Sequence, residues 1–480
     1  MTLDKLLEGV KVLKTAGNSE IQVNNVCMDS RKVGKGDMFI CIPGNVVDGH
    51  IFASEAVEKG ASVIVCERSP ECELDAVIIV VEDARKSMAL IASNFYGNPA
   101  SELKLIGVTG TNGKTTTTYL VKSILEGVGK KTGLIGTNQN LAGDEVLPAS
   151  HTTPDCLEFH SLLRKMKDCG CEYVVMEVSS HALCMHRVYG CRFEAAGFTN
   201  LTPEHIDYHK SMESYFEAKK MLFDICRCGV VNFDDEYGKK LIELYPGTLS
   251  GFSVKESSWL TVGEVKLLSD SVRFTINHDG AEYEFSLAIP GEFSVYNAAL
   301  AVGLCLRIGV GIDECHRGIA SAKGVCGRIE VVPVNKDYTV IIDYAHTPDG
   351  LLNILKAVRG FCRGRLILLF GCGGDRDKTK RPVMGEIAVK SADFCIITSD
   401  NPRTESPRGI IDDIIKGIPL GCGDKYVVIE NRFDAIKHSL SVAKKDDVVL
   451  LAGKGHENYQ ILKDKTIDFD EHEIVRSLVF

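Results

Sequence analysis

Short apolar runs rich in β-branched residues recur along the chain, and segments with the spacing of amphipathic helices lie between them. This alternation predicts parallel β-sheets covered by helices, which is the α/β class. In the first part of the chain we expect strands at 37–42, 61–67 and 76–82, with a helix at 50–60. Asn-Pro and Gly then interrupt the pattern at 96–103. We therefore place a first domain boundary near residue 100.

A second block of the same kind follows the boundary. Strands are expected at 131–137, 172–178 and 229–236, with helices such as 211–226 between them. From 259 to 289 the pattern changes to strict alternation with a His-Asp-Gly turn, which predicts antiparallel hairpins. The central domain, 101–327, should therefore combine a parallel sheet with a small antiparallel sheet.

The third block, 328–480, contains further apolar strand candidates, each followed by loop and helix signals. This pattern predicts a Rossmann-like C-terminal domain. A chain of 480 residues fits three domains at about 150 residues each. The fold class expected is thus α/β, with three consecutive α/β domains at 1–100, 101–327 and 328–480.

Composition narrows the functional classes. The formal net charge of −10 argues against a nucleic-acid partner, which would favour a basic surface. No signal peptide and no long apolar stretch is evident, so we expect a cytoplasmic protein without membrane insertion, and a monomer. The 18 cysteines contain no C-x-x-C pair, which leaves zinc and redox motifs unsupported. Buried thiols in a reducing compartment are the better interpretation.

The stretch 106–120, IGVTGTNGKTTTTYL, predicts a strand, a glycine turn and the start of a helix. It resembles a Walker A loop, although the strict form requires glycine where Val108 stands. Backbone amides of such a turn bind phosphate oxygens, Lys114 would reach the β/γ-phosphates, and Thr115 would bind a magnesium ion. The residues expected to bind ATP here are Gly110, Thr111, Asn112, Gly113, Lys114, Thr115 and Thr116.

Charged residues follow several other predicted strands, at the edge where α/β sheets bind ligands. Glu177 ends an apolar strand, where a carboxylate requires a cation, and Mg²⁺ would supply it. The alternative is that Glu177 is simply exposed or salt-bridged. His205 and His209 are four residues apart, a spacing that serves a metal or merely stabilises a turn.

A series of motifs, in this order along nearly the whole chain, resembles those of the Mur ligases, the ATP-dependent amide-forming enzymes of peptidoglycan precursor synthesis. They are TGTNGKTTT, HTTPD, MEVSSHAL, LTPEHIDYH, YFEAKKMLF, YNAALA, DYAHTPD, GCGGDRDKTKRP, DNPRTE and GKGHENYQ. The set is similar to that of members that add the third residue of the stem peptide. One motif alone would be weak evidence, but the full ordered set is strong.

The resemblance implies the substrates UDP-MurNAc-L-Ala-D-Glu, meso-diaminopimelate and ATP, an acyl-phosphate intermediate, and Mg²⁺. It also implies a carbamate on Lys219, which without the family would be interpreted as a solvated helix lysine. The implied catalytic residues are Lys114, Glu177, His205 and Lys219, and the implied metal ligands are Thr115, Glu177, His205 and Lys219. Further implied nucleotide contacts are Asn297, Arg328, Asp343 and His346.

Substrate contacts follow from the same resemblance. Those implied for the UDP-muramoyl dipeptide are Ser30, Thr152, Thr153, Ser179 and Arg187, whereas Met185 replaces a residue that is polar in some relatives. Those implied for the amino acid are Arg376, Asp400, Asn401, Pro402, Arg403, Gly453 and Glu457. Arg403 would bind the extra carboxylate of diaminopimelate, unless it only pairs with Glu405 or a neighbouring acid.

Two other functions remain open at this point. One is a different amide ligase of the superfamily, such as folylpolyglutamate synthetase or a ligase that adds D-glutamate or D-Ala-D-Ala. The motif DNPRTE favours the third-residue enzymes over these. The other is a non-enzymatic P-loop switch or precursor sensor, which would not release phosphate in a substrate-dependent way.

Overall fold

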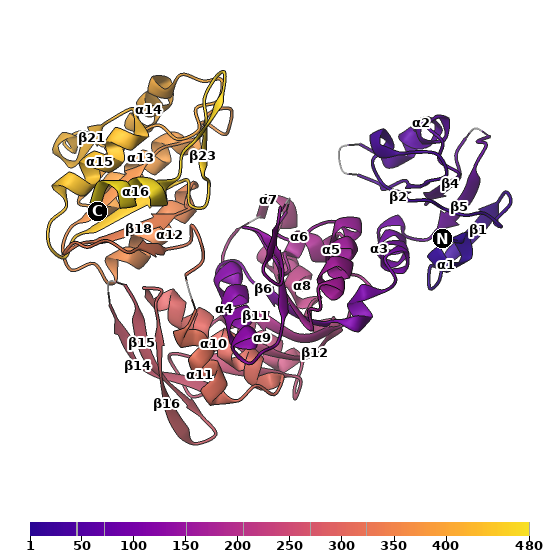
Figure 1. Ribbon diagram of the computed structural model, residues 1–480, viewed down its shortest axis with the longest axis horizontal. Coiled ribbons are helices and arrows are strands. Elements are labelled where there is room, and N and C mark those ends of the chain that lie inside the picture. The colour runs from indigo at the N-terminus through magenta and orange to yellow at the C-terminus, as the bar shows by residue number, and fades with distance from the viewer. Residues whose placement is uncertain are drawn as a thin grey trace. The chain divides into compact units, whose positions relative to one another are not determined.

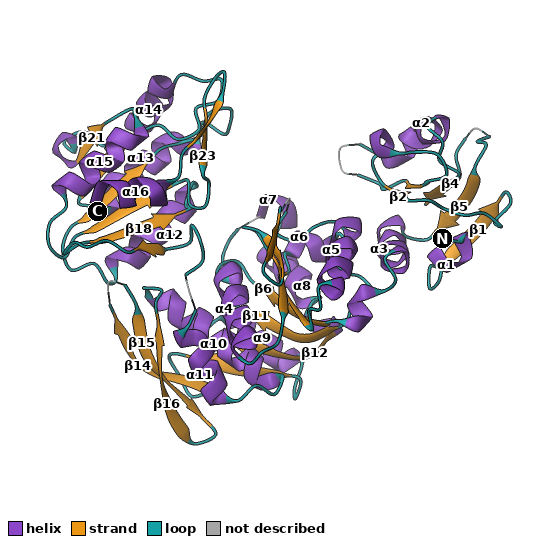
Figure 2. Cartoon of the chain, in the orientation of Figure 1, coloured by secondary structure: helices purple, strands orange, loops and turns teal. Residues whose placement is uncertain are grey.

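The computed structural model describes residues 1–44, 47–71, 73–149, 151–204, 206–268, 270–322 and 324–479 (Figure 1). The chain forms two compact units, Met1–Gly251 with Gly303–Gly311, and Phe252–Val302 with Ile312–Phe480. Strands and helices alternate through much of each unit (Figure 2), so the α/β prediction is confirmed. No helix in the described ranges is long and apolar enough to cross a membrane.

The first sheet of unit 1 has five strands in the order β1-β5-β4-β3-β2, with β1 antiparallel to its neighbour. Strands β3, β4 and β5 confirm the three predicted strands, because their side chains are almost all buried. Asp83 caps α3 by accepting the amides of Arg85 and Lys86. The elements are α1 (Leu3–Leu6), β1 (Val12–Ala16), β2 (Val26–Cys27), β3 (Met38–Ile40), α2 (Ala53–Glu58), β4 (Val63–Cys66), β5 (Val77–Val81) and α3 (Ala84–Phe95).

The second sheet has 11 strands, and its part from β12 to β9 runs in the order β12-β11-β6-β10-β7-β8-β9, in which the strands from β12 to β7 are parallel. Strand β6 lies inside this sheet, with β10 and β11 on either side. The elements are β6 (Lys104–Thr109), α4 (Lys114–Gly127), β7 (Thr132–Ile135), β8 (Asn140–Ala142), β9 (Glu145–Leu147), α5 (Cys156–Asp168), β10 (Tyr173–Glu177), α6 (Ser180–Cys184), β11 (Phe193–Phe198), α7 (Ile206–His209), α8 (Met212–Lys220), β12 (Cys226–Asn232), α9 (Glu236–Leu244) and β13 (Leu249–Ser253).

The helix predicted at 211–226 is shorter than expected. Ser211 caps the N-terminus of α8 through the amide of Ser214, but α8 ends at Lys220. A 3-10 turn at Phe223–Ile225 follows, and Cys226 already pairs with β11 as the first residue of β12. Sheet pairing therefore overrides local helix propensity at the end of this segment.

Unit 2 begins with the predicted antiparallel hairpins. Strands β14, β15 and β16 are antiparallel neighbours, with a shift in register where Gly263 lies in β14. The elements here are β14 (Leu260–Leu267), β15 (Val272–His278), β16 (Ala281–Leu287), α10 (Glu292–Arg307), whose last residues from Gly303 belong to unit 1, and α11 (Ile312–Ala320).

The last sheet of unit 2 has the order β17-β18-β22-β19-β20-β21, and only β17 is antiparallel. Helices α12, α13 and α14 bury one apolar face of it, and α15 and α16 bury the other. The elements are β17 (Glu330–Val332), β18 (Thr339–Asp343), α12 (Pro348–Arg359), β19 (Leu366–Phe370), α13 (Lys380–Ser391), β20 (Phe394–Ile397), α14 (Pro407–Ile415), β21 (Tyr426–Val428), α15 (Arg432–Val442), β22 (Val448–Ala452), β23 (Tyr459–Ile461), β24 (Thr466–Asp468) and α16 (Glu471–Val479).

Candidate active site

The predicted phosphate loop connects β6 to α4. Gly110 and Gly113 have φ angles of 142° and 87°, in the region that favours glycine. A Cβ atom on Gly110 would lie 1.8 Å from the Thr199 hydroxyl oxygen, so no other residue fits there. Helix α4 begins at Lys114, and the amides of its first turn therefore face this loop. A glycine turn that leads into a helix N-terminus is a common arrangement of phosphate-binding loops.

Asn200, just beyond β11, braces the phosphate loop. Its carbonyl accepts the Thr111 amide at 2.8 Å, and its side-chain oxygen accepts the Asn112 amide at 3.0 Å. Its side-chain nitrogen returns a 3.2 Å bond to the Asn112 carbonyl. Asn200 was not predicted as a site residue. It lies two residues beyond the end of β11, among the strand-end positions where ligand-binding residues are expected.

Two lysines converge on the carbonyl of Gly110. Lys114 Nζ donates to it at 3.0 Å and also to the Thr111 carbonyl at 2.8 Å, while Lys219 Nζ donates at 2.7 Å. Lys219 is 1% exposed on α8, and its Nζ lies 4.5 Å from the ring centroid of Tyr215. Burial, and then the positive charge of Lys114, hold the pKa of Lys219 well below its usual 10.5. The Lys219 amine is therefore more often neutral than that of a surface lysine.

Glu177 lies beside this loop at the carboxyl end of β10. Strands β10 and β6 are parallel, and Glu177 pairs in register with Val108. The carboxylate is 1% exposed and accepts bonds from the Thr137 amide at 2.8 Å and the Thr137 hydroxyl at 3.0 Å. No ion pair to Glu177 forms among the residues described, so the exposed or salt-bridged alternative does not hold there. Thr137 was missed by the sequence analysis.

The residues expected to contact the muramoyl dipeptide adjoin Glu177. The Thr137 and Thr152 hydroxyl oxygens lie 3.1 Å apart, within hydrogen-bonding distance, and the Thr153 hydroxyl donates to the Glu177 carbonyl at 2.9 Å. The Ser179 amide donates to the Thr153 hydroxyl at 3.1 Å. Ser179 is also the N-cap of α6. The structure thus brings the three predicted hydroxyl residues together.

Arg187 belongs to the same group. Its guanidinium donates to the Thr153 carbonyl at 2.5 Å and lies 3.7 Å from the Met185 sulfur. Met185, which replaces a polar residue of some relatives, therefore contacts the arginine. Ser30, expected to contact the UDP-sugar, lies in the first sheet's domain, where its hydroxyl donates to Glu55 at 3.3 Å.

The two histidines whose spacing suits either a metal or a turn differ. His205 lies outside the described residues, so its role stays a prediction. His209 is 6% exposed, its Nε2 lies 2.8 Å from the Ser180 hydroxyl, and its ring stacks on Tyr215 at 4.7 Å between centroids. These contacts favour the structural interpretation of His209.

In unit 2, the residues expected around the nucleotide gather near Tyr344. The Arg328 guanidinium carbon lies 5.6 Å from the centroid of the Tyr344 ring, and the His346 ring lies 4.6 Å from it. Asp343 ends β18, is 6% exposed, and accepts the amide of Ala345 at 2.8 Å; burial raises its pKa. Tyr344 was not predicted as a site residue, although it lies within the motif DYAHTPD.

Asn297, the remaining residue expected at the nucleotide, lies on α10 and is 5% exposed.

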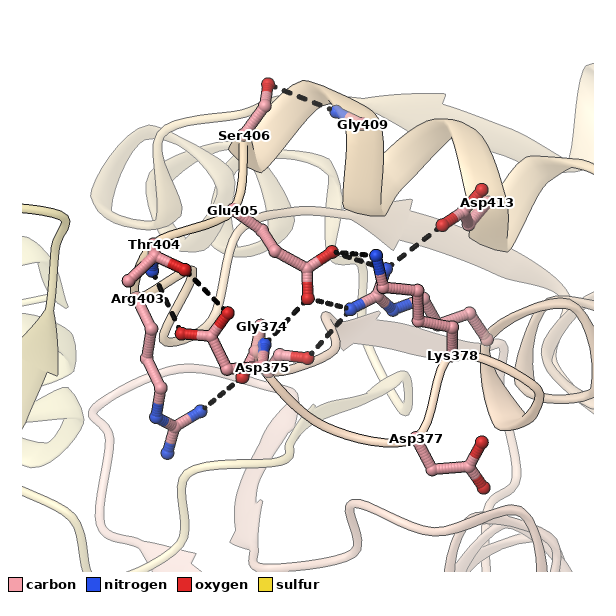
Figure 3. A network of polar contacts seen from close by, with 12 residues as sticks. Gly374, Asp375, Asp377, Lys378, Arg403, Thr404, Glu405, Ser406, Gly409 and Asp413 are labelled. Carbon is pink, nitrogen blue, oxygen red and sulfur yellow. Dashed lines mark hydrogen bonds and ion pairs between the residues drawn. The ribbon is translucent and has the colours of Figure 1, made fainter.

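The two loops expected to bind the amino acid are joined by side chains (Figure 3). Asp375 accepts the Thr404 amide at 3.1 Å and the Thr404 hydroxyl at 2.7 Å, and its own amide donates to Glu405 at 2.6 Å. Glu405 in turn pairs with Arg381 at 2.9 Å and Lys378 at 3.1 Å. Arg381 is fully buried and also pairs with Asp413 on α14 at 3.0 Å. Arg381 was not predicted as a site residue.

This network settles the alternative partner of Arg403. Its guanidinium points away from Glu405 and donates to the Gly374 carbonyl at 2.9 Å (Figure 3). In the described part of the chain no carboxylate lies within ion-pairing distance of it, so the pairing with Glu405 does not form. Arg403 is half-buried, with a φ of 52°, and lines a hollow of about 380 Å³ together with Leu462 and Lys463. Its charge is therefore available to an anionic group.

Asn401 and Glu457 meet at a buried lysine that the sequence analysis missed. Asn401 donates to Glu457 at 2.8 Å, and Lys454 Nζ lies 3.2 Å from the same carboxylate and 3.4 Å from the Asn401 oxygen. Lys454 is fully buried. Asp400 approaches it at 4.0 Å, and a Cβ on Gly453 would lie 2.9 Å from the Asp400 carboxylate. Asp400, Asn401, Lys454 and Glu457 thus form one packed polar cluster.

The other two predicted amino-acid contacts flank that cluster. The Pro402 carbonyl would lie 1.9 Å from a Cβ on Gly374, which requires glycine there. Arg376 is exposed and donates to the Asp375 carbonyl at 3.2 Å.

Three family models match the chain. They are described as "Mur ligase family, catalytic domain" (residues 22–96), "Mur ligase middle domain" (108–305) and "Mur ligase, glutamate ligase domain" (327–455). A curated protein of Clostridium acetobutylicum, UDP-N-acetylmuramoyl-L-alanyl-D-glutamate--2,6-diaminopimelate ligase 1, is 48% identical over 100% of this chain and 99% of its own. The chain belongs to the Mur ligase family.

Solved structures agree with this assignment. One of a UDP-N-acetylmuramoyl-L-alanyl-D-glutamate--2,6-diaminopimelate ligase has a TM-score of 0.74 at 29% identity, over 100% of this chain and 98% of that one. A MurF ligase of Thermotoga maritima in complex with ADP has a TM-score of 0.61 at 19% identity, over 95% and 97% of the two chains. The second likeness supports the fold alone.

Replacing Arg381 tests whether it holds the two loops together. In Arg381→Met, Glu405 loses its buried partner, and the amide of Asp375 that depends on Glu405 should open more often. We expect hydrogen exchange in 373–376 and 401–405 to accelerate about 10- to 100-fold, the equivalent of one charged hydrogen bond of ~1.5–3 kcal/mol. Arg408→Met, which removes an exposed pair with Asp412 on α14, is the control and should leave these rates unchanged. Equal exchange in both variants would show that Arg381 does not order the loops.

Proposed function

We propose that this protein joins meso-2,6-diaminopimelate to the γ-carboxylate of D-glutamate in UDP-MurNAc-L-Ala-D-Glu, with ATP converted to ADP and phosphate. The observation that carries the proposal is the glycine-bounded loop whose Gly110 carbonyl receives both Lys114 and Lys219. The full-length curated relatives bear the name of this reaction. It is an ATP-dependent, amide-forming step of peptidoglycan precursor synthesis.

The phosphate loop suits the first chemical step. A carboxylate oxygen is a poor leaving group, and transfer of the γ-phosphoryl group to it gives an acyl phosphate. The amides of the first turn of α4 and the Lys114 ammonium would stabilise charge on the phosphoryl oxygens, whereas Asn200 accepts the amides of Thr111 and Asn112. This contribution is mainly positioning and electrostatics. The incoming amine then attacks the carbonyl carbon, and the tetrahedral intermediate collapses to amide and inorganic phosphate.

The donor groups near the loop fit a magnesium ion. The Thr115 hydroxyl and the Glu177 carboxylate are hard oxygen ligands, and Glu177 has lone pairs beyond the two bonds from Thr137. Bound magnesium would offset charge on the phosphates. His205 is kept as a further proposed ligand.

Lys219 fits the proposed carbamate. Its Nζ lone pair would attack the carbon of CO₂, and loss of one N–H proton would turn the neutral amine into a carbamate anion with two oxygen ligands. Only a neutral amine reacts in this way, and burial beside Lys114 favours the neutral form by lowering the pKa of Lys219. Lys220, which is half-buried and pairs with Glu217, lacks that environment.

Arg403 is the proposed reader of the amino acid. Diaminopimelate carries a carboxylate at its far end that lysine lacks, and a guanidinium binds such a group through two charge-assisted bonds. Because Glu405 forms its ion pairs with Arg381 and Lys378, it does not neutralise the charge of Arg403. Asn401, Asp400 and Pro402 are proposed to shape that loop, with Glu457, Gly453 and Arg376 as further contacts.

The contacts to the UDP-sugar, the dipeptide and the nucleotide are also proposed. Ser30 would contact the UDP-sugar; Thr152, Thr153, Ser179 and Arg187 the dipeptide; and Asn297, Arg328, Asp343 and His346 the nucleotide. Domains at 1–100, 101–327 and 328–480 are supported by the limits of the family matches. The cytoplasmic location and the monomeric state stay predictions.

Phosphate release from ATP tests the function. We expect release to require both UDP-MurNAc-L-Ala-D-Glu and meso-diaminopimelate, and to fall at least about 10²-fold in Lys114→Ala, which removes a phosphoryl contact. A precursor sensor would bind nucleotide without this dependence. Release in the absence of either substrate, or near-normal turnover of a folded Lys114→Ala, would contradict the proposal.

Chemical rescue tests the carbamate. Lys219→Ala should be almost inactive, and added acetate should restore part of the activity because a small carboxylate can enter the anionic position. Lys220→Ala is the matched control and should keep near-normal activity. If Lys219→Ala is fully active, or if acetate stimulates both variants equally, the carbamate has no role.

Amino-acid selectivity tests Arg403. Two charged bonds of ~1.5–3 kcal/mol each correspond to a preference for diaminopimelate over L-lysine of about 10² to 10⁴ in kcat/KM. Arg403→Ala should lose most of that preference, whereas the exposed Arg408→Ala should keep it. Equal use of lysine by the wild type, or unchanged selectivity in Arg403→Ala, would mean that this arginine does not read the substrate.

A further inference from the structure

Three potential metal ligands meet in unit 2, whereas the residues proposed above to bind magnesium belong to unit 1. A sulfur of Cys326, a carboxylate oxygen of Glu330 and a ring nitrogen of His472 all lie within 4.8 Å of one another. Cys326 is exposed, while Glu330 and His472 are half-buried, so an ion can reach the group from solvent. The composition predicted buried thiols, and the exposed Cys326 does not fit that prediction.

The histidine is held as a metal ligand usually is. Its Nδ1 lies 3.2 Å from the Asp470 carboxylate, while its Nε2 faces Glu330 at 2.9 Å. A carboxylate on one ring nitrogen fixes the orientation and leaves the other nitrogen for a metal. Glu330 is fixed as well, because its carboxylate accepts the Gly327 amide at 2.7 Å. Two of the three ligands, His472 and Glu330, are thus positioned before any ion binds.

We propose that Cys326, Glu330 and His472 form a zinc-binding site, with Asp470 orienting the histidine. One thiolate, one imidazole and one carboxylate are the donor types of zinc proteins, whereas magnesium takes oxygen ligands. In a tetrahedral zinc site, neighbouring ligand atoms are about 3.3–3.7 Å apart. The His472 and Glu330 atoms, now 2.9 Å apart, would separate slightly, and no pair in the group, all within 4.8 Å, needs to move by more than about 1.5 Å. The fourth position is left to water.

Charge balance supports the assignment. A thiolate and a carboxylate carry two negative charges, which one divalent ion neutralises, and Asp470 adds a third negative charge beside the imidazole. Binding would release the proton of the Cys326 thiol and leave His472 neutral, so zinc uptake should release protons and weaken at low pH. The ion would tie Cys326 and Glu330, the first residue of β17, to His472 in the first turn of α16, all within unit 2.

The site has a structural consequence that rests on the proposed function. Arg328, a proposed nucleotide contact, lies between Cys326 and Glu330 in the sequence. A bound ion would restrict the backbone on both sides of it. Cys326 and His472 are far apart in the sequence, so no short sequence motif could indicate the site.

Metal binding to the full-length protein tests the proposal without any measurement of activity. The protein is stripped with a chelator and titrated with Zn²⁺, and separately with Co²⁺, in a large excess of Mg²⁺ that occupies oxygen-ligand sites. We expect one equivalent of zinc to remain bound after dialysis, and a near-ultraviolet thiolate-to-cobalt band with Co²⁺. Cys326→Ser and His472→Gln should abolish the band and lower zinc affinity by more than about 100-fold. Asp470→Asn should lower it about 10- to 100-fold, as loss of an orienting carboxylate does.

Two variants serve as matched controls, because the chain has many cysteines. Cys422→Ser and His438→Gln remove half-buried residues of the same types elsewhere in unit 2 and should leave stoichiometry and the cobalt band unchanged. Circular dichroism melting confirms that each variant is folded. The proposal is overturned if the wild type retains no zinc, or if zinc retention and the cobalt band survive in folded Cys326→Ser and His472→Gln.

Discussion

The Gly110 carbonyl, which receives both Lys114 and Lys219, is the constraint on which the candidate active site depends. Two ammonium groups at one carbonyl repel each other, and a buried position offers little water to screen them. Lys114 is half-buried at the start of α4, whereas Lys219 is 1% exposed, so Lys219 is the lysine that gives up its proton more easily. A neutral amine next to a phosphate loop is the reactive group that a carbamate requires.

Sheet order places the other groups around that carbonyl. Because β10, β6 and β11 are parallel neighbours, their carboxyl ends bring Glu177, the glycine loop and Asn200 to one edge. In unit 2 the same logic brings together the loops after β19 and β20. There the buried Arg381 forms an ion pair with Glu405. The Arg403 guanidinium therefore donates to backbone carbonyls, and its charge is not neutralised by that carboxylate.

Sequence patterning predicted the buried strands well and the exposed ones poorly. The continuous apolar runs of β4, β10 and β19 are visible because both faces are covered. Strand β1 was missed because most of its side chains are exposed, and β2 because it spans two residues. The length of α8 depended on the pairing of Cys226 with a distant strand, which no local pattern reveals.

The candidate site divides in the same way. Glycine spacing and strand ends pointed to the phosphate loop and Glu177, and the resemblance supplied Lys219 and Arg403. No sequence pattern indicated four residues of the site, Thr137, Asn200, Arg381 and Lys454. Each contacts a residue that lies 24 to 88 positions away in the sequence, so only the fold reveals it. The burial that lowers the pKa of Lys219 likewise depends on a loop 109 residues away.

The central claim, that Lys219 is a neutral and reactive amine, is tested most directly by ¹³C NMR of the protein in ¹³C-bicarbonate at neutral pH. The account predicts a carbamate resonance in the wild type and in Lys220→Met that is absent in Lys219→Met. Absence of the resonance from the wild type, or its persistence in Lys219→Met, would contradict the account.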